Sequence, residues 1–337
     1  MEASLASSVY NKSVCQEGTI VRLSLDKCVA FIKQLQEGER FPASLAMLRG
    51  AAFFAGYEFA IEALLADDVH VIRDRLDDTG SGFVGIDVPQ GIASEPATDA
   101  LMGSVIASAI ISAFMMPLLD PRNGTPFTVY TASPDNEEAL QKAGVKFYAP
   151  TEKLGFHTDG MLKNSAVYVP RYIGLYNIVI AYNKPGCFYW VPFAAWPQFD
   201  EWAGVLGWNR AYRFEATPIV YAGALDRAEE AGARIIEAPV FWRDTSGDER
   251  AVFMNGDLQG PVDGDGDFDS RLVQRMKQSI ACDARRIALP QRQRRLFLMN
   301  NTAGFHARDL FDAPIPGARY TRSFLRSVAS EGPRITP

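Results

Sequence analysis

Cysteine, histidine and long apolar runs are all scarce in this sequence. Of 337 residues, four are cysteine and three are histidine. The cysteines are scattered and include no Cys-x-x-Cys pair, so we interpret them as reduced, mostly buried thiols. No run of about 18 uncharged apolar residues occurs, and the most apolar stretch, 101–119, predicts a buried helix. The first residues lack the basic and apolar regions of a signal peptide, so we expect a cytoplasmic protein without a membrane partner.

An excess of positive charge is also missing. The 34 Lys and Arg residues are outnumbered by 40 Asp and Glu residues, which gives a net charge of −6. A nucleic-acid-binding protein usually presents a basic face, so nucleic acid is not an expected partner. The one basic run, 285–295, is interpreted as a solvated edge strand. A hydrophobic content of 47% is ample for a large core.

The pattern of apolar residues predicts a mainly β protein with flanking helices. Helical spacing is found at 24–36, 43–66 and 99–119, and later at 225–232 and 269–285. Short β-type runs separated by Gly, Pro and Asn predict a sandwich or barrel. These runs are 82–89, 127–132, 145–148, 166–169, 174–183, 187–193, 235–243, 250–254, 288–289 and 294–299. We expect a single domain over 1–337, with a helical buttress at about 1–120 and a β-core at about 82–330.

Two of the three histidines lie in segments that could form one metal site. In the stretch 155–160, His157 and Asp159 are two residues apart, so on a strand both side chains point to the same face. His306 lies in a second glycine-containing stretch, 300–308. Two His and one carboxylate on one side of a metal are the ligands of a non-haem Fe(II) oxygenase. Zinc can use the same ligands in a hydrolase, and a lone histidine is often only structural, as we interpret His70.

Arginines follow His306 at a spacing that suits an anionic ligand. Arg322 and Arg326 are four residues apart and share a face on either a strand or a helix, and Arg319 precedes them. A guanidinium group binds a carboxylate through two parallel hydrogen bonds. A solvated basic surface is the alternative interpretation.

Together these motifs resemble the Fe(II)/2-oxoglutarate-dependent dioxygenases, in particular the taurine dioxygenase and clavaminate synthase group. His157-x-Asp159 is followed by His306 and then by Arg322-x-x-x-Arg326. The segment 300–308 is similar to the group's D-N-x-x-x-x-H-G-R pattern, and 82–89 looks like its N-terminal strand. The resemblance spans roughly 82–326.

The resemblance implies a distorted double-stranded β-helix, the jelly-roll or cupin-like fold, with the metal at one mouth. His157, Asp159 and His306 would bind Fe(II). Arg322 best matches the arginine that grips the distal carboxylate of 2-oxoglutarate, Arg326 would support it or face the substrate, and Arg319 competes for the first role. A hydroxyl partner for this carboxylate is expected after 185–186, where Tyr189 is the nearest candidate.

The reaction implied by the resemblance consumes O2 and 2-oxoglutarate and releases succinate and CO2. It hydroxylates an unactivated C–H bond of a small molecule, by resemblance a free amino acid or an amino-acid-derived natural product. Related halogenases have a small residue at the position of Asp159, so the carboxylate here argues against halogenation. Desaturation and cyclisation use the same ligands, and a non-catalytic jelly-roll binding protein is a further alternative. The sequence predicts no oligomeric state.

Overall fold

The computed structural model describes most of the chain. The described residues are 13–14, 19–50, 52–133, 152–163, 166–216, 234–254, 257–264, 268–269 and 271–335. The strand predicted at 145–148 and the helix predicted at 225–232 lie outside them.

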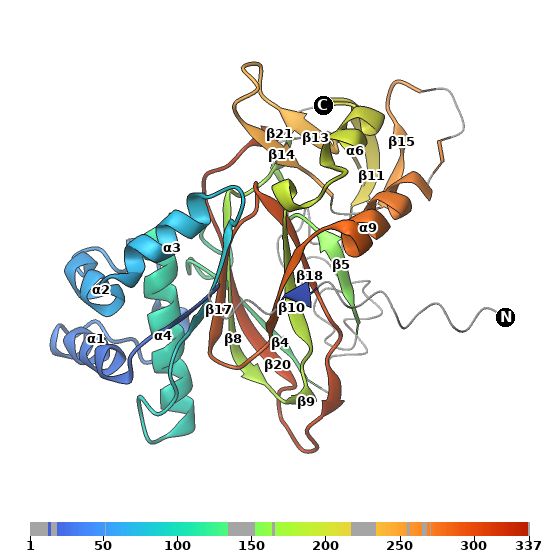
Figure 1. The fold of residues 1–337 in the computed structure, drawn as a ribbon. Helices are drawn as coiled ribbons and strands as arrows, with labels where there is room; N and C mark the ends of the chain where they lie inside the picture. Colours follow the sequence, from blue (N-terminus) through green and yellow to red (C-terminus); the bar gives the residue numbers. More distant parts are fainter. Residues whose placement is uncertain are drawn as a thin grey trace.

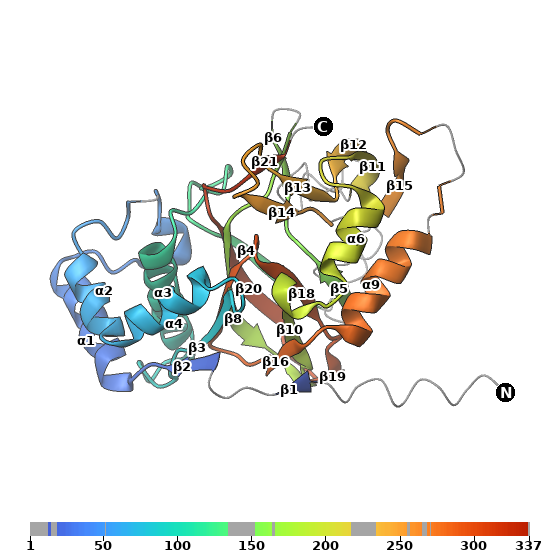
Figure 2. The same ribbon diagram turned by 45° about the horizontal axis from the view of Figure 1, so that its top comes forward.

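Two β-sheets face each other at the centre of the fold (Figures 1 and 2). The larger sheet has the order β2-β3-β17-β8-β20-β4, and the smaller has the order β1-β16-β10-β18-β5. The strands of the larger sheet are β2 (Ile20–Arg22), β3 (Phe83–Asp87), β17 (Arg295–Asn300), β8 (Tyr172–Ile180), β20 (Arg322–Val328) and β4 (Thr128–Ala132). Those of the smaller sheet are β1 (Ser13–Val14), β16 (Arg286–Pro290), β10 (Cys187–Pro192), β18 (Gly304–Arg308) and β5 (Leu154–His157). Neighbours in both sheets are antiparallel, except β2–β3 and β1–β16. Apart from β2 and β3, strands that are adjacent in a sheet are not consecutive in the chain, as in a jelly roll.

Alternation along the strands decides which side chains fill the space between the sheets. Phe83 and Phe297 of the larger sheet stack with Phe188 and Trp190 of the smaller one. The ring centroids of Phe188 and Phe297 lie 4.6 Å apart. Because successive strand residues point to opposite faces, the neighbours of these aromatic residues face outward and need cover.

Helices cover the outer face of the larger sheet. They are α1 (Leu25–Glu37), α2 (Glu58–Leu65), α3 (Asp68–Asp77) and α4 (Pro96–Phe114), and all four share one apolar cluster with the sheet. The helix α4 begins with proline in its first turn, where the Glu95 side chain accepts hydrogen bonds from two backbone N–H groups. Among the described helices, α4 alone is long and apolar enough to cross a membrane, but most of it is buried in this core. The prediction of a buried helix here is confirmed.

A second group of elements covers the outer face of the smaller sheet. It comprises α6 (Phe199–Leu206), β11 (Ala211–Ala216), β12 (Arg234–Pro239), β13 (Phe241–Arg243), β14 (Arg250–Val252), β15 (Asp257–Pro261) and α9 (Arg271–Asp283). The buried stripe of α9 contains Val273, Met276 and Ile280, so the predicted role of this helix as a sheet cover is confirmed. The remaining short elements are η2 (Leu45–Met47), η3 (Phe193–Ala195), β6 (Met161–Lys163), β7 (Ala166–Tyr168), β9 (Tyr182–Lys184), β19 (Asp312–Pro314) and β21 (Arg334–Ile335).

The prediction of one continuous helix at 43–66 is wrong. The structure has only η2 and α2 there, separated by an irregular segment. Gly50 and Gly56 adopt φ values of 81° and 87°, which a right-handed helix excludes. Leu48 and Phe54 of this segment are buried by the tertiary packing of a turn-rich chain, and that packing outweighs the helical spacing.

Candidate metal centre

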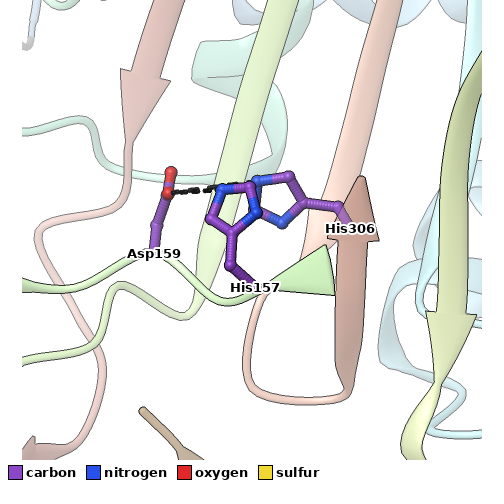
Figure 3. Close-up of side chains that lie close together, drawn as sticks. All are labelled: His157, Asp159 and His306. Carbon is purple, nitrogen blue, oxygen red and sulfur yellow. Dashed lines mark ion pairs between the residues drawn. The ribbon is translucent and has the colours of Figure 1, made fainter. Parts of the chain in front are cut away.

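The two histidines are direct neighbours across an antiparallel pair of strands. His157 ends β5 and pairs in register with His306 in the middle of β18. Because paired residues point to the same face, both imidazoles project into the space between the sheets, where their ring centroids lie 4.1 Å apart. Figure 3 shows the two rings side by side with the Asp159 carboxylate pointing at them.

Asp159 completes a compact cluster of three candidate ligands. Its Oδ1 lies 3.6 Å from Nε2 of His157 and 3.9 Å from Nε2 of His306. One ligand atom from each residue lies within 4.8 Å of the others. The three residues are 7%, 9% and 3% exposed for His157, Asp159 and His306. The predicted ligands are therefore brought together in a buried position.

The protonation states suit a metal ion. Nδ1 of His157 lies 2.9 Å from the carbonyl oxygen of Gly155, and donating to this oxygen leaves the Nε2 lone pair directed at the cluster. Burial lowers the pKa of His157, and burial together with His157 lowers the pKa of His306 to about 3. Burial alone raises the pKa of Asp159, but Arg326 and the two imidazoles more than offset it and hold that pKa below its usual range. Two neutral imidazoles and an ionised carboxylate are the forms that bind metal.

Asn301 fixes the backbone that carries Asp159. Its side chain is completely buried, accepts a hydrogen bond from the Asp159 N–H at 2.9 Å, and donates to the Asp159 carbonyl oxygen at 2.9 Å. The same amide nitrogen donates to the carbonyl oxygen of Pro170. The role of this residue was missed from the sequence; the one signal was the D-N-like pattern at 300–301.

Thr158 anchors the loop from the other side. Its hydroxyl donates to the carbonyl oxygen of Val252 at 2.6 Å and accepts from the N–H of Met254 at 3.1 Å. The loop between His157 and Asp159 is thus tied to the elements that cover the smaller sheet. This role also has no signal in the sequence.

Arg326 reaches the carboxylate from the larger sheet. Its Nη2 donates to Oδ2 of Asp159 at 2.7 Å and its Nε donates to the same oxygen at 3.2 Å. The two oxygens of Asp159 are therefore divided, since Oδ1 faces the imidazoles and Oδ2 faces the guanidinium group.

Arg322 lies four residues earlier on β20 and is 6% exposed. Its guanidinium carbon lies 4.1 Å from the ring centroid of Phe324 and 5.0 Å from that of Phe311. Two aromatic faces thus restrain the plane of this cation inside the fold. Arg319 is placed differently: it is exposed in the segment before β20 and contacts the ring of Tyr320.

The prediction that Tyr189 supplies a hydroxyl partner for the carboxylate of 2-oxoglutarate is wrong. Tyr189 faces away from the space between the sheets, and its hydroxyl donates to Oδ2 of Asp309 at 2.7 Å. The adjacent Phe188 faces inward, with its ring centroid 5.8 Å from that of His306. The third histidine, His70, lies exposed on α3.

Two facing sheets with a buried pair of histidines and a carboxylate between them define a class of fold that solved structures share. No protein-family model matches the sequence, and no curated protein matches it. An asparagine oxygenase in complex with Fe(II), 3-hydroxyasparagine and succinate has a TM-score of 0.62 at 14% identity, covering 92% of this chain and 93% of its own. The non-haem iron oxygenase OrfP in complex with Fe and α-ketoglutaric acid has a TM-score of 0.60 at 13% identity, covering 93% and 94%. This chain therefore has the jelly-roll fold of non-haem iron oxygenases, as the resemblance in its motifs predicts.

Proposed function

We propose that the protein is an Fe(II)/2-oxoglutarate-dependent oxygenase that hydroxylates a small molecule in the cytoplasm. The observation that carries the proposal is the buried cluster of two neutral imidazoles and one ionised carboxylate between the two sheets. This donor set fits Fe(II) with open coordination positions. The jelly-roll fold supports the same function, and we propose that it is a distorted double-stranded β-helix in one domain.

The residues that would hold iron are Nε2 of His157, Nε2 of His306 and Oδ1 of Asp159. When bound, iron and 2-oxoglutarate supply an oxidative decarboxylation with O2 that yields succinate and CO2 and oxidises an unactivated C–H bond. The chain orients the ligands and excludes water. Asn301 holds the backbone of Asp159, and stacked aromatic residues such as Phe188 keep the region around His306 apolar.

Arg322 is the residue we assign to the distal carboxylate of 2-oxoglutarate. It is buried on the inner face of β20 and restrained by two rings, so its N–H groups are pre-oriented for a planar anion. Exposed Arg319 is the weaker candidate for this role. Arg326 lies closer to the candidate ligands, where it holds Asp159 ionised and is placed to face a substrate carboxylate.

Amino acids are the substrate class that we propose. The asparagine oxygenase was solved with 3-hydroxyasparagine, and OrfP was solved with Fe, succinate and (3S)-hydroxy-L-Arg. A free amino acid or a related natural product would present a carboxylate to Arg326. Desaturation or cyclisation of such a substrate would use the same residues.

An anaerobic spectrum tests the proposal. Fe(II) and then 2-oxoglutarate are added to metal-free protein, and the visible metal-to-ligand charge-transfer band is recorded. We expect a band in the wild type and in the control His70→Ala, and none in His157→Ala. Arg322→Ala should need at least about tenfold more 2-oxoglutarate, because it loses a charge-assisted pair of hydrogen bonds. A folded, iron-loaded wild type without a band would contradict the proposal and favour a zinc hydrolase or a binding protein.

A further inference from the structure

A side-chain amide on β8 is buried between the two sheets, and no described residue accepts a hydrogen bond from it. Asn177 on β8 is 3% exposed, and its amide nitrogen Nδ2 has no hydrogen-bond partner among the described residues. Its backbone is satisfied in the ordinary way, since the carbonyl oxygen accepts from the N–H of Arg294. A buried donor without an acceptor costs about 1–3 kcal/mol, so such groups are rare and need an explanation.

The direction of this side chain follows from its strand. Tyr176 and Ile178 belong to the apolar cluster under the helices, while Ile173 and Leu175 belong to the cluster between the sheets. Because side chains alternate along a strand, Asn177 points to the same side as Ile173 and Leu175. Its unpaired amide is therefore directed into the space that also contains the candidate metal centre.

Arg322 is the neighbouring cation. Asn177 pairs in register with Phe324 on β20, so their side chains lie next to each other on the inner face. The guanidinium group of Arg322 lies over that same Phe324 ring, at 4.1 Å from its centroid. The amide of Asn177 and the guanidinium group of Arg322 therefore flank one ring.

The position along the strand also suits a short dicarboxylate. Arg326, which binds Asp159, pairs in register with Leu175, so Leu175 marks the level of the candidate metal ligands. Asn177 is two residues further along β8, about 7 Å deeper between the sheets. A five-carbon 2-oxo acid bound at the metal by one end would bring its distal carboxylate to this level.

The facing strand offers no competing donor. The inward residues of β10 are Phe188 and Trp190. Phe188 has no polar atom, and Nε1 of Trp190 donates to the carbonyl oxygen of Ser81. A hydroxyl group, which the motif resemblance placed on this strand, is replaced here by the ring of Phe188.

We infer that the carboxamide of Asn177 donates a hydrogen bond to the distal carboxylate of 2-oxoglutarate, beside the guanidinium group of Arg322. This inference rests on the proposed function. A carboxylate accepts about four hydrogen bonds, and a guanidinium fork supplies two of them. Asn177 supplies another, and the bond satisfies a buried donor, Nδ2, for which the described part of the chain offers no acceptor. Asn177 is thus a binding residue for the co-substrate.

Asn177→Leu tests the inference, because leucine keeps the volume and removes the donor. In anaerobic Fe(II)-loaded protein, the charge-transfer band is titrated with 2-oxoglutarate and, separately, with 2-oxobutyrate, which keeps the 2-oxo acid but lacks the distal carboxylate. We expect the Kd for 2-oxoglutarate to rise about tenfold and the Kd for 2-oxobutyrate to stay within twofold of the wild-type value. The urea midpoint of the metal-free variant should be equal to or higher than that of the wild type, since an unsatisfied buried donor has been removed.

Tyr176→Phe is the matched control, since it changes the adjacent residue on the opposite face of β8 and should leave both Kd values unchanged. Asn177→Asp is a second variant of nearly the same shape that turns the donor into an acceptor. It should raise the Kd for 2-oxoglutarate further and leave the Kd for 2-oxobutyrate unchanged. The inference is overturned if Asn177→Leu binds 2-oxoglutarate with the wild-type Kd, or if the Kd values for both 2-oxo acids rise by the same factor. A wild type that gives no band at all contradicts the proposed function instead.

Discussion

At the scale of single residues, the candidate centre depends on side chains that never contact the metal position. Asn301 makes three hydrogen bonds, two of them to the backbone of Asp159. Without them, a buried N–H and two buried carbonyl oxygens lose their partners. The orientation of the Asp159 carboxylate toward the imidazoles is therefore set by an amide from a different segment of the chain.

Asn301→Ala should lower the free energy of unfolding by about 2–4 kcal/mol, because it leaves several buried polar groups unpaired. It should also weaken Fe(II) binding at least tenfold, since the ligand loop is released. Urea unfolding and an Fe(II) titration measure the two effects.

The matched control is Asn209→Ala. Asn209 makes the same pair of hydrogen bonds to the backbone of Arg243, but at an exposed turn. This variant should lower the free energy of unfolding by at most about 1 kcal/mol and leave the affinity for Fe(II) unchanged. Equal Fe(II) affinity in Asn301→Ala and the wild type would show that the loop holds its shape without Asn301.

At the scale of elements, local patterns predict some parts of the fold and miss others for physical reasons. The helices α1, α4 and α9 follow from apolar spacing, because α1 and α9 each bury one stripe and α4 buries most of its length. The pairing of His157 with Asp159 was predicted from the two-residue period of a strand, but β5 ends at His157 and Asp159 lies in the loop that follows, where Asn301 holds its backbone. The break at 43–66 depends on glycine backbone angles that apolar spacing does not encode.

The missed residues share a different property. Asn177, Thr158 and Asn301 are ordinary polar residues whose roles arise from strand register and from loops far away in the sequence. No local pattern carries that information. His306 was predicted because the chain has only three histidines and this one, like His157, lies in a glycine-containing stretch; the resemblance of its flanking residues to a known segment then supported the prediction.

Helix α4 shows how tertiary packing reverses a local preference. Gly103 lies inside α4, where alanine would ordinarily be more favourable by about 1 kcal/mol. A Cβ atom at this position would overlap the guanidinium group of Arg294, which forms a buried ion pair with Asp99 and a hydrogen bond to Tyr176. The close approach of α4 to this pair requires glycine.

Gly103→Ala is therefore expected to destabilise the protein by about 2 kcal/mol or more, because it disturbs a buried ion pair. Gly204→Ala is the matched comparison: Gly204 also lies in a helix, α6, and no atom of the described residues lies within 4 Å of its added Cβ. In that variant the free energy of unfolding should rise by up to about 1 kcal/mol. Urea midpoints compare the two, and a stabilised Gly103→Ala would disprove the steric argument.

At the scale of the whole molecule, burying the cluster links stability to pH. In the native protein His306 has a pKa of about 3, whereas an unfolded histidine has its ordinary value of 6.5. Between these values the unfolded chain binds a proton that the native chain does not, so stability falls as the pH falls. The pKa of Asp159 is also lowered, but its contribution is lost only below about pH 4.

From pH 7 to pH 5, His306 should account for about 2 kcal/mol of the loss of stability in metal-free protein. Urea unfolding at both pH values measures the loss, and in His306→Gln it should be smaller by that amount. An identical loss in the variant and the wild type would mean that His306 titrates normally in the folded protein.

The register pairing of His157 with His306 has a consequence for folding. The two residues are 306 − 157 = 149 positions apart in the chain. Such a pairing closes a long loop and forms slowly compared with local helices. A chain that has formed α1 to α4 but has not yet docked β18 against β5 offers the metal only His157 and Asp159. Tight metal binding during refolding would thus report the docking of β18 against β5 in the smaller sheet.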